Sequence, residues 1–273
     1  MKIPFMKMSG SGNDFILIDH RIPFLGQAEM KEFARKVCQR RVSVGADGLI
    51  LIERSEKADF KWRFFNADGS EAEMCGNGGR CAARFAHLKG IAGPSLSFET
   101  LAGIISAQVN GKRVKLQMTK PHGLKLDERI SVAGAEEIFS SINTGVPHAV
   151  IFLKDLEDRD VVQMGRAIRC HSQFVPAGTN VNFVRLESPS HLSVRTYERG
   201  VEDETLACGT GVVASALVAA FKGLVTSPVS VRTRGGEILT VHFEIEGKEV
   251  KQIFFEGDVH IIYEAEMWEE AYK

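Results

Sequence analysis

Two cysteines have the same local setting, although they lie far apart in the chain. Cys75 is followed by Gly-Asn-Gly and Cys208 by Gly-Thr-Gly, and each pattern opens a stretch with helical spacing. The N-terminus of a helix presents unsatisfied N–H groups and about half a positive charge. A thiol at that position has a lowered pKa, and a glycine-rich turn there can hold an anion such as a carboxylate. We therefore expect two reactive thiols, each beside a carboxylate-binding turn.

An internal repeat connects the two cysteines. Adding 133 to a residue number gives 12 identities in the 35 positions from 71 to 105, including Cys75 with Cys208, and no gap is needed over roughly ninety residues. Average composition would give about two or three identities. Coincidence among common small residues is the alternative. We interpret the chain as two copies of one αβ unit, approximately 1–119 and 120–262.

Two acid/base thiols on opposite faces of one carbon would perform stereoinversion. One thiolate removes an α-proton and the other thiol returns a proton from the opposite side, so both pKa values must lie near the working pH. The α-proton of an amino acid is very weakly acidic. N–H groups that converge on the substrate carboxylate would therefore stabilise the charge that develops there.

Other interpretations of the cysteines remain open at this point. A cysteine at the start of an apolar helix is often a small buried hydrophobic residue. Cys75 and Cys81 could form a redox pair, but position 214, which matches Cys81, is alanine. A Cys-x5-Cys spacing without a histidine cluster disfavours zinc. We expect Cys38, Cys81 and Cys170 to be structural, and we expect neither a metal nor a cofactor.

Hydrophobic patterning predicts similar elements in both copies. Helices are expected at 29–40 and 156–170, and after each cysteine up to a Lys-Gly stop. Strands are expected at 15–19, 48–53, 62–66, 95–100, 103–109, 114–118, 149–153, 180–186, 193–199, 229–233, 237–243 and 250–263. Few of these strands are linked by crossover helices, which favours an α+β fold. The segment Gly211–Phe221 is apolar on every side, so we expect a core helix enclosed by sheet.

Composition limits the classes of function. The 273 residues suffice for two compact lobes. A net charge of -1 with a pI near 6.7 makes nucleic acid or an anionic membrane surface an unexpected partner. The longest apolar stretch, Gly211–Phe221, is shorter than the ~20 residues that span a bilayer. Five cysteines without a disulfide framework and an N-terminus without an apolar signal core favour a reduced, cytoplasmic protein.

Four segments resemble the diaminopimelate epimerase family: GSGNDF, FNADGSEAEMCGNGGRC, GTNVNFV and YERGVEDETLACGTG. They occur in the family's order over nearly the whole chain, and the two cysteine motifs are highly specific. The resemblance implies a pyridoxal-independent epimerase that interconverts LL- and meso-2,6-diaminopimelate, a step toward lysine and peptidoglycan. The alternatives are an epimerase or racemase of another amino acid and a non-catalytic amino-acid-binding relative.

The resemblance also implies roles for single residues. Cys75 and Cys208 match the two acid/base thiols, and His148 and Glu198 match residues that modulate the thiol pKa values. The backbone amides of Gly76, Gly209 and Thr210 match groups that hold the reacting carboxylate. The full set of implied substrate-binding residues is Asn13, Asn66, Gly76, Asn77, Asn180, Glu198, Arg199, Gly209 and Thr210.

The implied fold is two pseudo-symmetric domains, each a mixed, barrel-like sheet wrapped around a central helix. We expect domains at 1–119 and 120–263, with the tail 264–273 packing on the first. The partner is a small-molecule substrate, and family members are often dimers, which suggests a homodimer. Two positions depart from the pattern. Val146 stands where many members have a substrate-contacting Asn, and Gly48 stands where some have a Gln.

Overall fold

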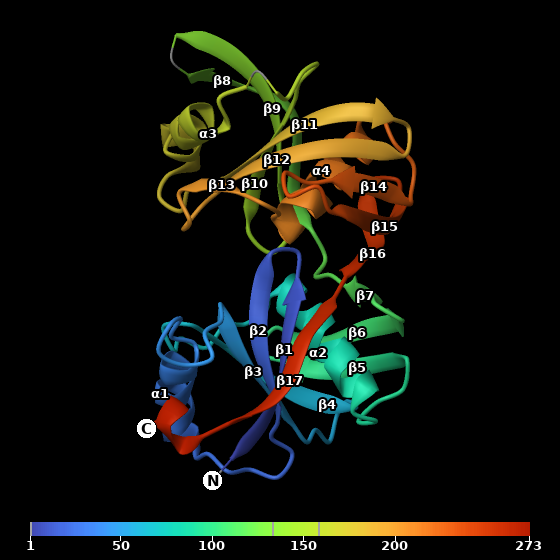
Figure 1. The fold of residues 1–273 in the computed structure, drawn as a ribbon. Helices are drawn as coiled ribbons and strands as arrows, with labels where there is room; N and C mark the ends of the chain where they lie inside the picture. Colours follow the sequence, from blue (N-terminus) through green and yellow to red (C-terminus); the bar gives the residue numbers. More distant parts are fainter. Residues whose placement is uncertain (1, 133, 158) are drawn as a thin grey trace. The chain divides into compact units, whose positions relative to one another are not determined.

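A computed structural model describes residues 2–132, 134–157 and 159–273 (Figure 1). Contacts divide them into a first unit, up to Leu116 together with Gly257–Lys273, and a second unit, Gln117–Glu256. The elements of the first unit are β1 (Ile3–Gly10), β2 (Asn13–Asp19), α1 (Gln27–Val37), β3 (Gly48–Glu53), β4 (Phe60–Asn66), α2 (Gly76–Leu88), β5 (Ser95–Thr100), β6 (Gly103–Asn110), β7 (Arg113–Gln117), β17 (His260–Met267) and η2 (Glu269–Ala271). Those of the second are β8 (His122–Val132), β9 (Ala135–Asn143), β10 (Pro147–Phe152), α3 (Val161–Arg169), η1 (Ser172–Phe174), β11 (Asn180–Ser188), β12 (His191–Glu198), β13 (Asp203–Thr205), α4 (Gly209–Phe221), β14 (Val229–Arg232), β15 (Ile238–Glu246) and β16 (Glu249–Asp258).

The two units share one order of strand pairing. In the first unit β1 pairs antiparallel with β17 and β2, and β2 pairs parallel with β3. In the second unit β9 pairs antiparallel with β8 and β10, and β10 pairs parallel with β11. The remaining pairs follow one order in both units. β3–β4 and β11–β12 are antiparallel, β4–β5 and β12–β14 are parallel, and the last two pairs in each unit are antiparallel. β13 pairs with β12 where the first unit has a single bridge between Phe65 and Glu71. The predicted α+β class with two similar halves and mixed sheets is confirmed.

β17 has the place in the first unit that β8 has in the second. β17 pairs with β1, and β8 pairs with β9 (Figure 1). The second unit therefore begins at Gln117, and the chain returns to the first unit at Gly257. The sequence predicts the domain boundary at 119 and the return at 264. The structure differs because β17, which begins at His260, is already a strand of the first sheet.

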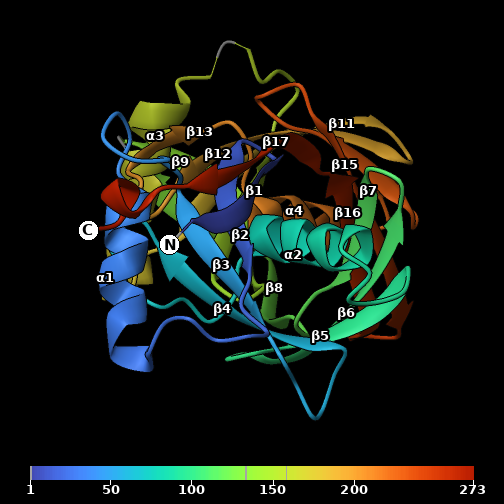
Figure 2. The ribbon, with the colours of Figure 1, turned by 60° about the horizontal axis from the view of Figure 1, so that its bottom comes forward.

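A central helix is enclosed by the sheet in each unit. The buried residues of α2 share one hydrophobic core with side chains from β1 to β7, and Figure 2 shows α2 lying along the curve of β5, β6 and β7. In α4 every residue from Gly211 to Ala219 is buried, which confirms the predicted core helix. Burial of apolar surface on all sides of a helix requires such an enclosure.

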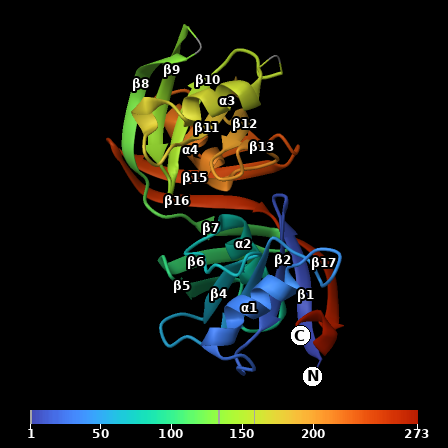
Figure 3. The same ribbon diagram turned by 90° about the vertical axis from the view of Figure 1, so that its left-hand side faces the viewer.

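A second helix packs on the opposite face of each sheet. Met30, Phe33 and Val37 of α1 are buried against β2 and β3. α3 lies against β11 and β12 (Figure 3), and Gly165 permits the approach, since a Cβ there would lie 2.3 Å from Tyr197 Cβ. The predicted helix 156–170 is too long, because Asp160 caps the N-terminus by accepting a hydrogen bond from Gln163 N at 2.9 Å. The predicted helix 29–40 is displaced toward 27–37.

The repeat is not free of gaps. Phe15 lies beside Gly48 in the parallel β2–β3 pair, and its counterpart His148 lies beside Asn180 in β10–β11. The offset is 133 between Phe15 and His148 but 132 between Gly48 and Asn180. The ungapped alignment is therefore wrong across β3 and β4. Residues under the central helices must therefore be matched by register. No helix among the described residues is both long and apolar enough to cross a bilayer.

Candidate active site in two halves

In the first unit, Cys75 is the N-cap of α2. Its backbone is extended, and its Sγ accepts a hydrogen bond from Gly78 N at 3.5 Å. The first intrahelical bond runs from Gly79 N to Cys75 O. The amides of Gly76 and Asn77 precede that bond, so the helix does not need them for its own ladder. This half can therefore present a thiol together with backbone donors for an anion.

Asn13 and Asn77 are joined by a side-chain hydrogen bond of 2.8 Å. A tight turn delivers Asn13: Ser11 and Gly12 both have positive φ, 50° and 87°, as a two-residue hairpin requires. Asn13 donates in turn to Asp47 Oδ2 at 3.0 Å, and Asn77 Oδ1 accepts from the buried Arg80 at 3.1 Å. Because a carboxylate only accepts and a guanidinium only donates, both amide orientations are fixed.

Asp47 is held in place by a cluster of charges at the base of the same turn. Arg40 donates to Asp14 at 2.6 Å and to Asp47 at 2.8 Å. Lys7, only 6% exposed, lies 2.9 Å from Asp14. Hydrogen bonds from Arg40 and Lys7 outweigh burial and lower the pKa of Asp14 to about 2. Arg80 also donates to Ser11 Oγ at 2.6 Å. The sequence analysis missed this network, although Ser11 and Arg80 lie within the quoted motifs.

Asn66 and Gly48 are register partners in β3 and β4. Asn66 is exposed and donates to Ser70 Oγ at 3.0 Å. A Cβ at Gly48 would lie 2.6 Å from Phe64 and 2.8 Å from Phe65 O. Phe64 occupies the space that a glutamine side chain would need, which accounts for this departure from the family pattern.

In the second unit, Cys208 is the N-cap of α4 and is 7% exposed. Its Sγ lies 3.6 Å from Thr210 Oγ1. The backbone N–H groups of Thr210 and Gly211 favour the thiolate, but burial and the nearby Glu198 outweigh them and raise the pKa of Cys208 to about 12. The expected low pKa is therefore wrong for Cys208, because desolvation exceeds the effect of the helix terminus.

Asn180 and Arg199 lie together beside β10. Asn180 is buried, and its Oδ1 accepts a hydrogen bond from Arg199 N at 2.8 Å. The guanidinium of Arg199 donates to Ala177 O at 3.0 Å, and Asn180 donates to Pro147 O at 3.4 Å. Glu198, the last residue of β12, has a raised pKa because it is largely buried. In the second unit, Glu198 therefore lies near Cys208, and Arg199 lies near Asn180 and His148.

His148 has partners that the sequence analysis did not identify. It is 1% exposed, and its Nδ1 lies 3.1 Å from Nδ2 of Asn182, a fully buried residue of β11. Thr196 on β12 donates to Asn182 Oδ1 at 2.9 Å. Burial and the charge of Arg199 lower the pKa of His148 to about 3. The motif NVN places Asn180 and Asn182 on the same face of a buried strand, and this pattern could have predicted a polar partner for His148.

Val146 lies in the turn that corresponds to the Ser11–Gly12 turn of the first unit. Here Thr144 donates to Thr210 O at 3.0 Å, which links the turn directly to the start of α4. In the first unit the same link is made through Asn13 and Asn77. Val146 therefore replaces a polar group without separating the turn from the helix.

The other cysteines have no place in either half. Cys38 and Cys81 are buried in apolar clusters, and burial raises the pKa of each to about 12. Cys170 is exposed at the C-cap of α3. Among the described residues, no three His, Cys, Asp or Glu side chains gather as metal ligands.

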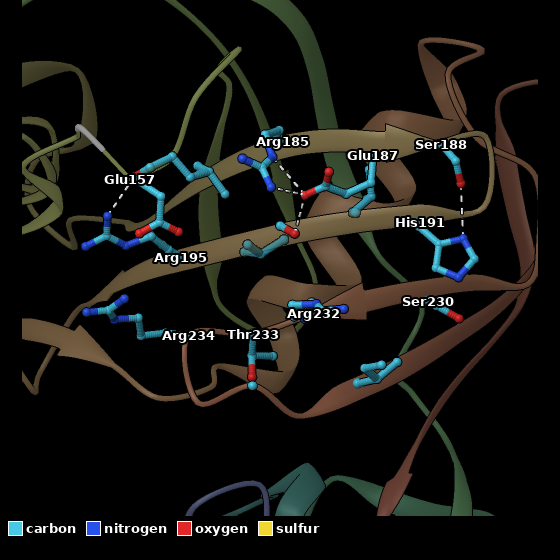
Figure 4. Close-up of a pocket in the computed structure, with 16 residues that line it drawn as sticks. Glu157, Arg185, Glu187, Ser188, His191, Arg195, Ser230, Arg232, Thr233 and Arg234 are labelled. Atoms are coloured by element: carbon cyan, nitrogen blue, oxygen red, sulfur yellow. Dashed lines mark hydrogen bonds and ion pairs between the residues drawn. The ribbon is translucent and has the colours of Figure 1, made fainter.

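A pocket of about 620 Å³ lies on the outward face of β11, β12 and β14 (Figure 4). Arg185 donates to Glu187 at 2.8 Å, and Arg195 donates to Glu204 at 2.7 Å and to Leu156 O at 2.7 Å. These pairs neutralise much of its charge. Of the described residues that line it, none belongs to the predicted site. A smaller pocket of about 200 Å³ is bordered by His148 and Thr179.

Sequence comparisons match most of the chain. A family profile described as diaminopimelate epimerase matches residues 5–123 and 140–262. A diaminopimelate epimerase of Aquifex aeolicus is 51% identical and covers 98% of both chains. That of Hydrogenobaculum sp. is 47% identical over 94% of this chain and 96% of its own, and that of Chlorobaculum tepidum is 45% identical over 94% and 98%.

Solved structures share the fold at low sequence identity. A Bacillus anthracis phenazine biosynthesis protein of the PhzF family has a TM-score of 0.74 at 20% identity and covers 98% of this chain and 99% of its own. A probable proline racemase from Agrobacterium radiobacter has a TM-score of 0.71 at 16% identity, covering 98% and 93%. These likenesses concern the fold alone.

Proposed function

The chain belongs to the diaminopimelate epimerase family, and from this membership we propose that it interconverts LL- and meso-2,6-diaminopimelate by a two-base mechanism without a cofactor. The observation that carries the proposal is the repetition of one arrangement: a cysteine N-caps the central helix of each unit, ahead of a Gly-x-Gly turn. Stereoinversion needs two such groups, one for each face of the α-carbon.

The two cysteines would divide the proton transfers. With its pKa raised to about 12, Cys208 is a thiol at neutral pH and suits the role of proton donor. The N–H groups of Thr210 and Gly211 are positioned to stabilise its thiolate when the reaction runs in reverse. Cys75 would remove the α-proton in the forward direction, with the Gly78 amide directed at its sulfur.

Substrate recognition would use the polar groups around each helix start. The amides that precede the first intrahelical bond, at Gly76 and Asn77 and at Gly209 and Thr210, would hold the reacting carboxylate. Asn13, Asn66, Asn180, Glu198 and Arg199 would serve the remaining ammonium and carboxylate groups. Amide oxygens and a carboxylate accept from ammonium, and a guanidinium pairs with a carboxylate.

The proposed setting is the cytoplasm, since both thiols must stay reduced to carry protons. The reaction acts on a free small molecule and needs neither nucleic acid nor a membrane. Assembly into a homodimer is a further expectation from the family.

Incubation with LL-diaminopimelate in deuterated water tests the proposal. We expect meso product with deuterium at one α-carbon, measured by mass spectrometry and chiral chromatography. The same incubation with proline and other amino acids carrying one carboxylate is the control. Turnover of such an amino acid, with no reaction of diaminopimelate, would replace the proposed substrate. Absence of exchange with every substrate would favour a binding protein.

A further inference from the structure

We propose that Asn182 and Thr196 hold His148 as the neutral tautomer that carries its proton on Nε2, so that His148 acts as a hydrogen-bond donor and not as an acid or base. The catalytic part of this inference rests on the proposed function. The tautomer itself can be tested without any activity.

The orientation of the Asn182 amide follows from its contact with the main chain. Asn182 Nδ2 lies 3.0 Å from Ala149 O, and a carbonyl oxygen can only accept. The nitrogen of the amide must therefore be on that side. Its oxygen then faces Thr196 Oγ1 at 2.9 Å, where the hydroxyl donates. The flipped orientation is excluded because it would set the amide oxygen against the carbonyl oxygen of Ala149, two acceptors with no hydrogen between them.

The second hydrogen of the same amide determines the state of the imidazole. Nδ2 lies 3.1 Å from His148 Nδ1 and donates to it, so Nδ1 must offer its lone pair. A neutral imidazole that accepts at Nδ1 carries its hydrogen on Nε2. Protonation of Nδ1 would set two donors against each other inside a fully buried contact. Nε2 itself makes no hydrogen bond within the described part of the chain, so it can donate to a bound group.

The surroundings of His148 also oppose a positive charge. The guanidinium of Arg199 acts on the imidazole with a like charge, and the ring is buried. Lys125 and Glu128 of β8 border the small pocket beside His148 and offset each other across 3.5 Å. These influences agree with the orientation that the hydrogen bonds impose.

The first unit shows that this polar arrangement is not needed to build the fold. In register, Phe15, Ile50 and Phe64 take the positions of His148, Asn182 and Thr196. A Cβ on Gly78 would meet Ile50 and Phe15, whereas a Cβ on Gly211 would meet Asn182 Oδ1 at 2.2 Å. Three polar residues replace three apolar ones only under the helix that starts at Cys208, so they serve that half specifically.

Nitrogen-15 NMR of histidine-labelled protein measures the tautomer directly. We expect the long-range proton couplings of His148 to show an unprotonated Nδ1 and a protonated Nε2, unchanged from pH 8 to pH 5. His148→Gln, which lacks the signal, assigns it. A protonated Nδ1, or a ring that titrates in this range, would overturn the proposal whether or not the protein is active.

Two substitutions of His148 test its role in turnover. Glutamine can donate a hydrogen bond from a similar position but cannot titrate, whereas phenylalanine, the residue of the other copy, can do neither. We expect His148→Gln to keep most of kcat and His148→Phe to lose roughly 10- to 100-fold, the effect of one hydrogen bond to a charged group. Equal loss in both variants, with both folded, would contradict a donor role.

Asn182→Asp should reverse the tautomer, because a carboxylate accepts from Nδ1–H. We expect the NMR pattern to invert and kcat to fall by about tenfold or more. Ile50→Val, at the matching position of the first unit, is the control and should leave the His148 signal unchanged. If Asn182→Asp does not fold, Thr196→Val provides the same test through a smaller change in the His148 signal. An unaltered pattern in a folded Asn182 variant would overturn the assignment. If the deuterium test fails while NMR shows the expected tautomer of His148, the proposed function is refuted and the tautomer assignment stands.

Discussion

The N-termini of α2 and α4 share a cysteine N-cap and a Gly-x-Gly turn, but different side chains lie beneath them. The residues beneath them are Phe15, Ile50 and Phe64 under α2, and His148, Asn182 and Thr196 under α4. At the turns beside them the contrast is reversed. Asn13 and Asn77 form a polar network next to α2, whereas Val146 lies in the corresponding turn next to α4. Duplication kept the thiol and its glycine turn, while the surroundings of the two thiols diverged.

This divergence shows which features the chemistry demands twice. A cysteine at a helix N-terminus and amides for a carboxylate occur in both units, as a reaction on both faces of one carbon requires. The side chains beneath the two helix starts and in the turns beside them differ between the units.

Removal of either thiol should have the largest effect. Cys75→Ala and Cys208→Ala should each reduce epimerisation by about 10²- to 10⁴-fold, the usual contribution of a general acid or base. Chiral chromatography of the product measures this. The buried Cys81→Ala is the control and should leave kcat within a few-fold. Wild-type rates in either single variant would show that the two halves do not act as a pair.

The buried histidine should make the second unit sensitive to acid. The unfolded chain binds a proton at His148 near pH 6.5, whereas the folded pKa is about 3. Stability is therefore fully present above pH 6.5 and is lost as pH falls toward 3, with a slope of about 1.4 kcal/mol per pH unit. His148→Phe should remove this slope in urea unfolding between pH 7 and pH 4. Equal slopes in the wild type and in His148→Phe would show that His148 does not make the second unit more sensitive to acid than the first.

Matching glycines should respond differently to alanine. A Cβ at Gly211 would lie 2.2 Å from Asn182 Oδ1, whereas at Gly78 the nearest atom, Ile50 Cδ1, is 3.3 Å away. We expect Gly211→Ala to destabilise by about 1–3 kcal/mol through overpacking. Gly78→Ala should be close to neutral, since the better helix propensity of alanine, about 1 kcal/mol, offsets a mild contact. Urea midpoints of the two variants decide the comparison, and equal midpoints would count against it.

Exchange of Asn13 and Val146 should have unequal effects, and Val146→Asn should have the smallest of all. Asn13→Val leaves Asn77 and Asp47 without their partner and should cost about 1–3 kcal/mol of stability or substrate binding. Val146→Asn adds a polar side chain to a half-buried turn and should change stability by less than about 0.5 kcal/mol. KM and urea midpoints measure both. A larger effect at Val146 would indicate that this turn, and not that of Asn13, makes the decisive contact.

The repeat made most of the fold predictable. The match of Cys75 with Cys208 located both central helices, and the apolar character of Gly211–Phe221 indicated that it is enclosed. The change of offset near Gly48 was not visible, because one shifted residue leaves the pattern of buried strands almost unaltered. The return of β17 to the first sheet was placed too late, since nothing in the composition distinguishes Gly257 from Glu264.

Site residues that belong to a sequence motif could be predicted. Residues that orient another side chain of the site could not. Asn182, Thr196 and Asp47 orient His148 and Asn13 through hydrogen bonds that only the structure shows. The pKa of Cys208 could not be inferred either, because the balance between burial and a helix terminus depends on how deeply the sulfur lies.

The place of β17 has a consequence for synthesis of the chain. β1 is synthesised long before β17, its partner on one side. Until His260–Met267 arrives, the first sheet carries an open edge and an uncovered Ile3 and Phe5. The first unit is thus completed after the second, and removal of β17 would expose the edge of β1.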